Sequence, residues 1–288
     1  MNYDIHTGLL KMLDNFNRKD VRKANFTYCH NHPKLIELAD KYNLKQIAGS
    51  GGELTQVLNL LHWLSANVYH YDAYAGSVPL NALDMLNYSF GKGHECGINC
   101  QSLATTLTEC YLSLGFKART IYIMPFNPFD TDNHVVSVVY ISALGKWIMA
   151  DPSFSAYMMD ESGTILSPWE ARKILENQGK ITLNDEFNYN GSTDKWTAEE
   201  FTAYIAKDLF FFHCGESSTF DANPFDPSKG IKMLTLAPVG FDVKKFMIEN
   251  AKWRIRHYGE SEGRLRFLAE TEKMEINYVS YEDFIANP

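Results

Sequence analysis

Residues 94–119 read "HECGINCQSLATTLTECYLSLGFKAR", and this stretch decides how the rest of the chain is interpreted. Asn99 is a favourable helix N-cap, and the leucines and the tyrosine that follow it recur at helical spacing. Gly115 is expected to end the helix, because glycine readily adopts the left-handed conformation just past a helix end. Cys100 would then lie in the first turn, where free backbone N–H groups and the helix dipole favour a thiolate.

A thiolate nucleophile also needs a base, and the segment after this helix predicts where one lies. Three strands are predicted, over residues 118–124, 134–141 and 146–151. His134 opens the second strand and Asp151 closes the third, and the midpoint between them falls near Ser142 in the hairpin loop. Antiparallel pairing should therefore bring the two side chains together. A carboxylate beside an imidazole holds its tautomer and stabilises the imidazolium, so we predict the catalytic residues Cys100, His134 and Asp151.

Other interpretations of these residues stay open at this point. A cysteine without a base is usually a buried structural thiol, and the histidine–aspartate pair would then be only an ion pair at the end of a hairpin. Zinc is a further alternative, since His94, Cys96 and Cys100 cluster and His213–Cys214 could add two ligands. Only "CGINC" has the ligand spacing of structural zinc sites, so we predict no metal and no cofactor.

The composition is that of a globular chain with a sizeable core. It has 288 residues, of which 45% are hydrophobic and 22% charged, and its formal net charge is -8. The negative charge disfavours nucleic acid and anionic lipid as partners, because both are bound by clustered lysine and arginine. The sequence contains no run of about 18 apolar residues, so no membrane span is predicted. The first residues do not resemble a signal peptide. Five cysteines, an odd number in a large chain, disfavour a disulfide scaffold and favour a reducing cytoplasm.

Signals outside this region predict an α+β fold in three parts. Pro33 is expected near the start of one helix, and Ser50 with Glu53 follows the pattern of a capping box for the next. Further helices are predicted over residues 54–68, 163–178, 196–209 and 243–258, and further strands over 210–215 and 232–239, with mixed strand signals beyond 258. The polar tract 182–195 is interpreted as a boundary. We therefore predict an N-terminal helical segment, a catalytic core and a C-terminal extension, over residues 1–52, 53–181 and 182–288.

Three blocks along the chain follow one known arrangement. They are "HWLSANVYHYD" at 62–72, then Cys100, Ala104, Leu114–Gly115 and Arg119, and then His134, Trp147 and Asp151–Pro152. This arrangement, over roughly residues 53–160, resembles the transglutaminase-like superfamily. That superfamily is the branch of papain-like cysteine enzymes that includes transglutaminases, microbial peptidases and peptide N-glycanases. We expect Trp147 to pack on the hairpin and Arg119 to be a structural ion-pair donor.

The resemblance implies a papain-like core, in which the nucleophile helix packs on an antiparallel sheet, with a C-terminal α/β extension. It also implies that His134 takes the Cys100 proton, that the thiolate attacks a carbonyl group and that an acyl-enzyme forms. His94 lies where papain-like enzymes often place an oxyanion-hole side chain, and is the candidate for that role. We predict a cysteine hydrolase that cleaves an amide bond in a peptide or peptide-like substrate, so that the expected partner is a peptide or protein substrate. The alternatives are an amine acyltransferase acting on protein glutamine, and a non-catalytic binding module that retains the fold.

Overall fold

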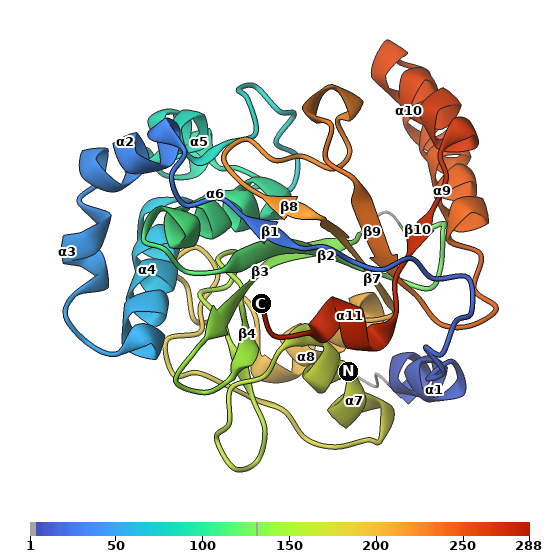
Figure 1. Cartoon of the computed structure of the whole chain (residues 1–288), viewed down its shortest axis with the longest axis horizontal. Helices are drawn as coiled ribbons and strands as arrows, with labels where there is room; N and C mark the ends of the chain where they lie inside the picture. The colour runs from blue at the N-terminus through green and yellow to red at the C-terminus, as the bar shows by residue number, and fades with distance from the viewer. Residues whose placement is uncertain (1–3, 131) are drawn as a thin grey trace.

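The computed structural model describes residues 4–130 and 132–288 (Figure 1). Its strands are β1 (Thr27–Tyr28), β2 (Ala118–Met124), β3 (His134–Ile141), β4 (Lys146–Ala150), β5 (Met158–Met159), β6 (Thr182–Leu183), β7 (Phe211–Gly215), β8 (Ser217–Ser218), β9 (Met233–Leu236) and β10 (Asn277–Tyr278). Its α-helices are α1 (Asp4–Met12), α2 (Pro33–Lys41), α3 (Leu44–Ala48), α4 (Glu53–Asn67), α5 (Ala82–Ser89), α6 (Cys100–Ser113), α7 (Pro168–Glu176), α8 (Ala198–Asp208), α9 (Val243–Tyr258), α10 (Glu262–Lys273) and α11 (Tyr281–Ile285). Two short 3₁₀ helices are η1 (His94–Cys96) and η2 (Pro227–Lys229).

A six-stranded sheet in the order β10-β9-β7-β2-β3-β4 forms the centre of the molecule. Neighbouring strands in it are antiparallel, except that β9 and β10 run parallel. β2 and β3 have the bounds that the sequence predicts, and β4 ends one residue earlier than predicted, with Asp151 directly after it. The chain does not alternate regularly between strands and helices, and the α+β prediction is confirmed.

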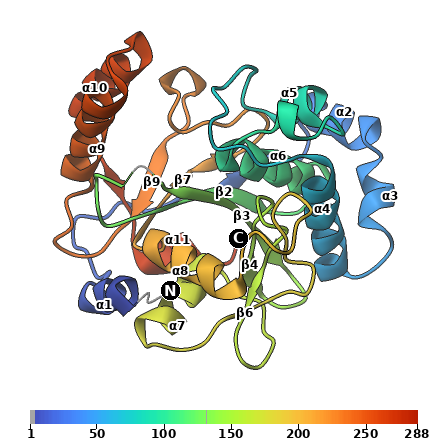
Figure 2. The same cartoon turned by 180° about the vertical axis from the view of Figure 1, so that it is seen from behind.

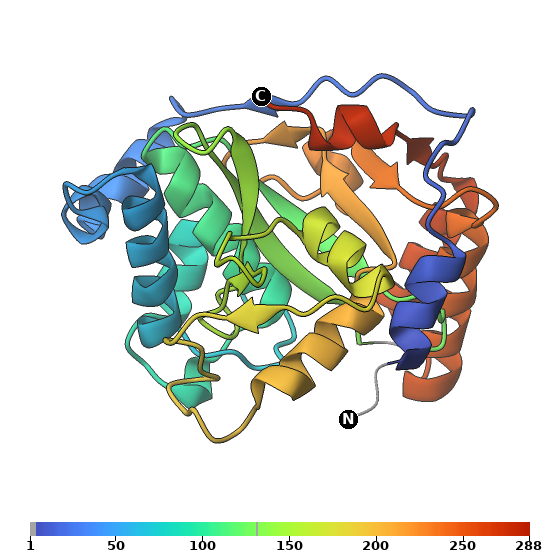
Figure 3. The same ribbon diagram turned by 90° about the horizontal axis from the view of Figure 1, so that it is seen from below.

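Helices cover both faces of this sheet, and each face has its own hydrophobic core. Figure 1 shows α6 on one side of the sheet and α7, α8 and α11 on the other. On the first side, α6 packs on β2 and β3 and shares a core with α2, α4 and α5 (Figure 2). On the second side, α7, α8 and α11 bury Trp169, Phe201 and Phe284 against Ile121 and Val136 of the sheet (Figure 3).

The helix α6 begins and ends where the sequence predicts. Asn99 is its N-cap, and the Asn99 side chain accepts a hydrogen bond of 3.0 Å from the backbone N–H of Ser102. Past its end, Gly115 has a positive φ of +89°, a conformation that disfavours any side chain with a Cβ. The backbone N–H of Gly115 donates to Leu112, and that of Phe116 donates to Tyr111. These two bonds form a Schellman motif and satisfy carbonyls that the helix leaves open.

Three expectations about other segments were wrong or incomplete. The capping box does not form, because α4 has Gly52 as its N-cap with no side-chain bond, and Glu53 instead accepts from the backbone N–H of Ala143. The helix α5 was not predicted at all. Beyond residue 258 the chain forms the helices α10 and α11 with only the two-residue strand β10 between them, in place of a mainly strand-like tail.

The C-terminal third of the chain joins the same sheet as the predicted core. β7 pairs with β2 over four positions, from Ile121 with Cys214 to Met124 with Phe211, and β9 and β10 follow outward. The division at 1–52, 53–181 and 182–288 stays a prediction. None of the helices within residues 4–130 and 132–288 combines the length and the apolar character that a membrane span requires.

Candidate active site

Cys100 is the first residue of α6, and its side chain is half-buried. The N-terminal turn of a helix offers unpaired backbone N–H groups and the positive end of the dipole to a thiolate. Burial raises the pKa of the Cys100 thiol, but its interactions with the imidazoles of His134 and His70 outweigh burial and lower the pKa from 9.0 to about 7. A substantial fraction of the thiol is therefore ionised near neutral pH.

His134 and Asp151 form a buried pair at the open end of the β3–β4 hairpin. His134 Nε2 lies 2.7 Å from Asp151 Oδ2, and the two side chains are 1% and 0% exposed. The second carboxylate oxygen, Oδ1, accepts from the backbone N–H of Ser153 at 2.9 Å. Ser137 pairs with Ala150 in this hairpin, so His134 and Asp151 are diagonal neighbours on one face, as counting back across the loop predicts.

The Asp151 carboxylate controls the protonation of the imidazole. Burial by itself lowers the pKa of His134, but the charge of Asp151, the hydrogen bond to it and the interaction with Cys100 raise that pKa well above 6.5. The rings of Phe154 and Tyr204 pack against the imidazole, with centroid distances of 6.0 and 5.3 Å. The site can therefore hold a thiolate beside an imidazolium whose orientation is constrained on several sides.

A second imidazole, that of His70, acts on the thiol and was not identified from the sequence. His70 follows α4 and is only 7% exposed. Ile98 donates its backbone N–H to Tyr69 and accepts the backbone N–H of Tyr71, both at 2.9 Å, and this pairing holds His70 beside the start of α6. The block at 62–72 contains His70, so the resemblance included this residue, but no spacing rule singles it out.

A hairpin at residues 189–192 holds His70 from the other side. The Asn190 amide makes two bonds with the backbone of His70: Oδ1 accepts its N–H at 2.7 Å, and Nδ2 donates to its carbonyl at 3.0 Å. The Tyr189 hydroxyl lies 3.0 Å from His70 Nδ1. This hairpin lies in the polar tract 182–195, which was interpreted from its composition as a boundary.

His94, the predicted oxyanion-hole residue, lies in η1 and is exposed. Its ring packs on Tyr69, with a centroid distance of 4.5 Å and an interplanar angle of 62°. The two imidazoles that lower the pKa of Cys100 are those of His134 and His70. The role of His94 stays a prediction, and His70 is a competing candidate.

The side chains considered for zinc do not gather at one place in the described part of the chain, where no three metal-binding side chains cluster. His213 is buried in β7, its Nδ1 lies 2.9 Å from Thr235 Oγ1, and burial lowers its pKa to about 3. All five cysteines are free thiols, including Cys96 and Cys100.

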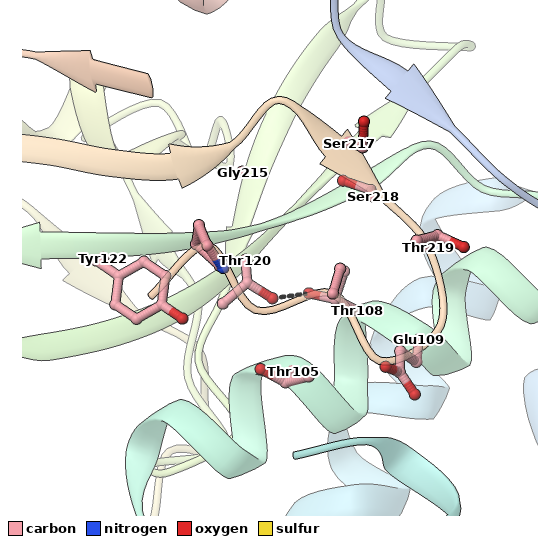
Figure 4. Close-up of a pocket in the computed structure, with 11 residues that line it drawn as sticks. Thr105, Thr108, Glu109, Thr120, Tyr122, Gly215, Ser217, Ser218 and Thr219 are labelled. Carbon is pink, nitrogen blue, oxygen red and sulfur yellow. Dashed lines mark hydrogen bonds between the residues drawn. The ribbon is translucent and has the colours of Figure 1, made fainter. Parts of the chain in front are cut away.

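A small cavity, lined largely by polar residues, lies beside α6 (Figure 4). Its volume is about 20 Å³, which is room for about one water molecule. It is lined by Thr105, Thr108, Glu109, Thr120, Tyr122, Gly215, Ser217, Ser218, Thr219, Ala222 and Pro224.

The buried Glu109 carboxyl, which lines this cavity, accepts hydrogen bonds from the backbone N–H groups of Ala82 and Asp221 at 2.7 and 2.8 Å, and burial raises its pKa to about 8. A cavity of this size has no room for a peptide.

Arg119 and Trp147, from the blocks that carry the resemblance, hold the C-terminal helix α11. The Arg119 guanidinium lies between the rings of Phe26 and Trp147, 4.1 Å from each centroid, and donates to the carbonyl of Phe284 at 3.0 Å. These contacts replace the predicted ion pair. Trp147 packs on Tyr140 across the hairpin as predicted, and its Nε1 donates to the carbonyl of Ala286.

Comparison with known proteins agrees with the resemblance. Among solved structures, the chain is similar to a candidate cysteine protease from Cytophaga hutchinsonii, with 18% identity, a TM-score of 0.32 and 52% of this chain covered. The alignment spans 49% of that protein. No curated protein sequence matches the chain. Residues 40–152 match the family described as the Transglutaminase-like superfamily, and this range contains Cys100, His134 and Asp151. Over this range the chain is therefore similar to the transglutaminase-like superfamily.

Proposed function

We propose that the protein is a cysteine hydrolase that cleaves an amide bond in a peptide or peptide-like substrate, with Cys100 as nucleophile, His134 as base and Asp151 as the group that orients His134. One observation carries the proposal. A half-buried thiol whose pKa is lowered to about 7 lies in the first turn of α6 and interacts with an imidazole that is hydrogen-bonded to a buried carboxylate. Nucleophile, base and orienting group in this relation are what acyl transfer to sulfur requires.

The proposed reaction has two stages. Cys100 Sγ attacks the carbonyl carbon, so that a C–S bond forms and the π electrons of the carbonyl move to oxygen. The C–N bond then breaks, the leaving amine takes the proton of the His134 imidazolium, and a thioester remains. In the second stage a water molecule gives its proton to His134 and attacks the thioester, the C–S bond breaks, and the thiolate and a carboxylic acid are formed.

The first test is labelling of the native protein with limiting iodoacetamide from about pH 5 to about pH 9, read residue by residue by mass spectrometry. Cys100 is expected to label fastest and to keep its reactivity below neutral pH, whereas His134→Ala should lose that advantage. The half-buried Cys29 is the internal control. Equal rates at Cys100 and Cys29 would contradict the proposal and favour the non-catalytic binding module.

Hydrolysis and amine acyl transfer share the same thioester, so the acceptor has to be tested separately. A glutamine-containing peptide is incubated with the protein, with and without a fluorescent primary amine. Release of the free acid, at a rate that the amine does not change, supports hydrolysis. Incorporation of the amine in place of water supports the acyltransferase alternative.

A further inference from the structure

We propose that His70 donates a hydrogen bond from Nε2 to the oxyanion of the tetrahedral intermediate, and that the hairpin 189–192 is the element that positions it. The inference rests on the proposed function, because an oxyanion forms only if Cys100 attacks a carbonyl group. His70 lies beside the start of α6, and three features carry the inference: a buried ring nitrogen without a hydrogen-bond partner, the tautomer of the ring, and the rigidity of the hairpin that supports it.

The first feature is the state of the two ring nitrogens. His70 Nε2 is buried and makes no hydrogen bond within the described residues, although the imidazole lies close enough to the Cys100 thiol to lower its pKa. A buried polar atom without a partner costs roughly 1–3 kcal/mol, which favours a role in binding something that is absent from the resting protein. Asp72 Oδ1 lies 3.3 Å from Nε2, and the Asp72 side chain is 84% exposed. Water competes for that carboxylate, so Asp72 does not prevent Nε2 from binding a substrate oxygen.

The second feature is the tautomer that a hydrogen bond donated by the Tyr189 hydroxyl selects. The Tyr189 hydroxyl lies 3.0 Å from His70 Nδ1, and burial raises the pKa of this phenol, so it keeps its proton at neutral pH. When the O–H donates to Nδ1, the proton of the neutral imidazole is on Nε2. Nε2 is then a hydrogen-bond donor, as an oxyanion requires.

The third feature is the rigidity of the support. The hairpin has Asn190 and Gly191 at its turn, with φ of 53° and 77°, and Tyr189 and Ser192 exchange backbone bonds of 2.9 and 3.0 Å. Asparagine followed by glycine is the preferred pair for a tight turn with two positive φ angles. Since Asn190 binds only the backbone of His70, replacing the imidazole leaves both of these bonds in place.

This hairpin lies outside residues 40–152, the range that matches the family. The matched core therefore supplies the nucleophile, the base and His70 itself, whereas a segment beyond the core sets the orientation of His70. We infer that Tyr189 and Asn190 are positioning residues, which act through His70 and do not contact the substrate carbonyl.

Two reactions of the same thiol separate an oxyanion role from any effect on thiolate formation. Iodoacetamide alkylates Cys100 without forming an oxyanion, whereas p-nitrophenyl acetate acylates it through a tetrahedral oxyanion. The alkylation rate of His70→Ala is first measured against pH to find the alkaline range in which it no longer rises, because the thiol is fully ionised there. Both rates are then measured in that range. Alkylation should stay within about threefold of the wild-type rate, while acylation should fall roughly 10²- to 10³-fold, the usual effect of one lost oxyanion donor.

Further variants test the geometry and the competing residue. His70→Gln keeps an N–H donor and should recover part of the acylation rate. Tyr189→Phe should lower acylation about tenfold with alkylation unchanged, as expected for a supporting hydrogen bond. The matched controls are Tyr258→Phe and His257→Ala, which remove a hydroxyl and an imidazole from α9, away from the site. Melting temperatures of all variants identify any that fail to fold.

The outcomes separate the two proposals. If Cys100 in the wild-type protein neither alkylates quickly nor acylates, the proposed function fails and the role of His70 fails with it. If the wild-type protein acylates and His70→Ala does so equally well, only the role of His70 is overturned. A loss of acylation in His94→Ala, with none in His70→Ala, would assign the oxyanion to His94 instead. If His70→Ala loses alkylation and acylation to the same extent, the oxyanion role is overturned, and His70 acts only by stabilising the thiolate.

Discussion

Cys100 and Cys110 lie on the same helix, α6, yet their thiols have opposite properties. Interactions with His134 and His70 lower the pKa of Cys100 to about 7 in spite of its burial. Cys110 is fully buried, and burial together with the neighbouring charge of Glu109 raises its pKa far above the usual range. The residue type is identical, so the environment alone decides which thiol can react.

The difference shows which features of a helix activate a cysteine. At the first turn the backbone N–H groups are free and side chains from other segments can approach the sulfur. In the middle of the helix every backbone N–H is paired and the surroundings are apolar, so Cys110 packs among the side chains of α2, α4 and α5 like a small hydrophobic residue. Reactivity depends on the helix end and on the imidazoles together.

The largest difference in acylation rate should be that between the two variants in which one of these cysteines is replaced by alanine. Cys100→Ala should lower acylation by p-nitrophenyl acetate by about 10⁴-fold or more, because the nucleophile is gone. Cys110→Ala should keep the acylation rate and lose only about 1 kcal/mol of unfolding free energy from lost packing. Burst kinetics and urea unfolding of both variants check this, and a reaction that survives in Cys100→Ala would contradict the assignment of the nucleophile.

Removing the carboxylate behind His134 should make Cys100 behave more like an ordinary thiol. In Asp151→Ala the charge and hydrogen bond that raise the pKa of His134 are lost, so the imidazolium form is lost at neutral pH. We expect a decrease in acylation of roughly 10²- to 10³-fold and an alkylation profile shifted to higher pH. Asp151→Asn, which can still accept a hydrogen bond, is the matched milder variant. An unchanged profile in Asp151→Ala would show that the pair does not control the thiol.

Glu109, the neighbour of Cys110, should make the free energy of unfolding depend on pH, because the same burial raises the pKa of its carboxyl group. Its pKa is about 8 in the folded protein against 4.5 in the unfolded chain, so the folded state binds more protons between these values. The free energy of unfolding should therefore decrease by a few kcal/mol as pH rises through this window. Glu109→Gln should flatten that part of the profile, at a constant cost of about 1–3 kcal/mol for one mismatched backbone N–H. Urea unfolding at several pH values measures both, and an identical slope would disprove this origin.

The smallest effect concerns the cap that forms the first turn around Cys100. Asn99→Ala removes the bond to the backbone N–H of Ser102 and should cost about 1 kcal/mol of stability. It should also slow alkylation of Cys100 a few-fold at neutral pH, because the first turn frays. Ser261→Ala removes the same kind of cap from α10 and should cost similar stability without changing the thiol. Equal alkylation in both variants would show that the capped turn does not contribute.

Local signals were sufficient for the core of the site. Asn99 and Gly115 mark the two ends of α6 because capping is a property of single residues and their nearest neighbours. The placement of His134 beside Asp151 follows from counting across a short hairpin, where the register leaves little freedom. These contacts are close in sequence, which is why they could be predicted.

Contacts between distant segments could not be predicted in the same way. The pattern at Ser50 and Glu53 suggested a capping box, but Glu53 finds the backbone of Ala143, and no local rule anticipates that. The composition of the tract 182–195 is polar and rich in turn-forming residues, but composition does not reveal that one amide binds the backbone of His70. His70 therefore escaped notice, because its neighbours come from segments that are distant in the sequence.

The contacts of Arg119 and Trp147 with α11 have a consequence for synthesis on the ribosome. The chain emerges from its N-terminus, so both side chains are made well before Phe284 and Ala286, whose carbonyls they bind. The hairpin 189–192 is also made after Cys100 and His134. We expect that, for a time, the nascent chain contains the segment of α6 with Cys100 but lacks the hairpin that holds His70 and the helix α11. Its thiol should gain full reactivity only after these later segments have left the ribosome.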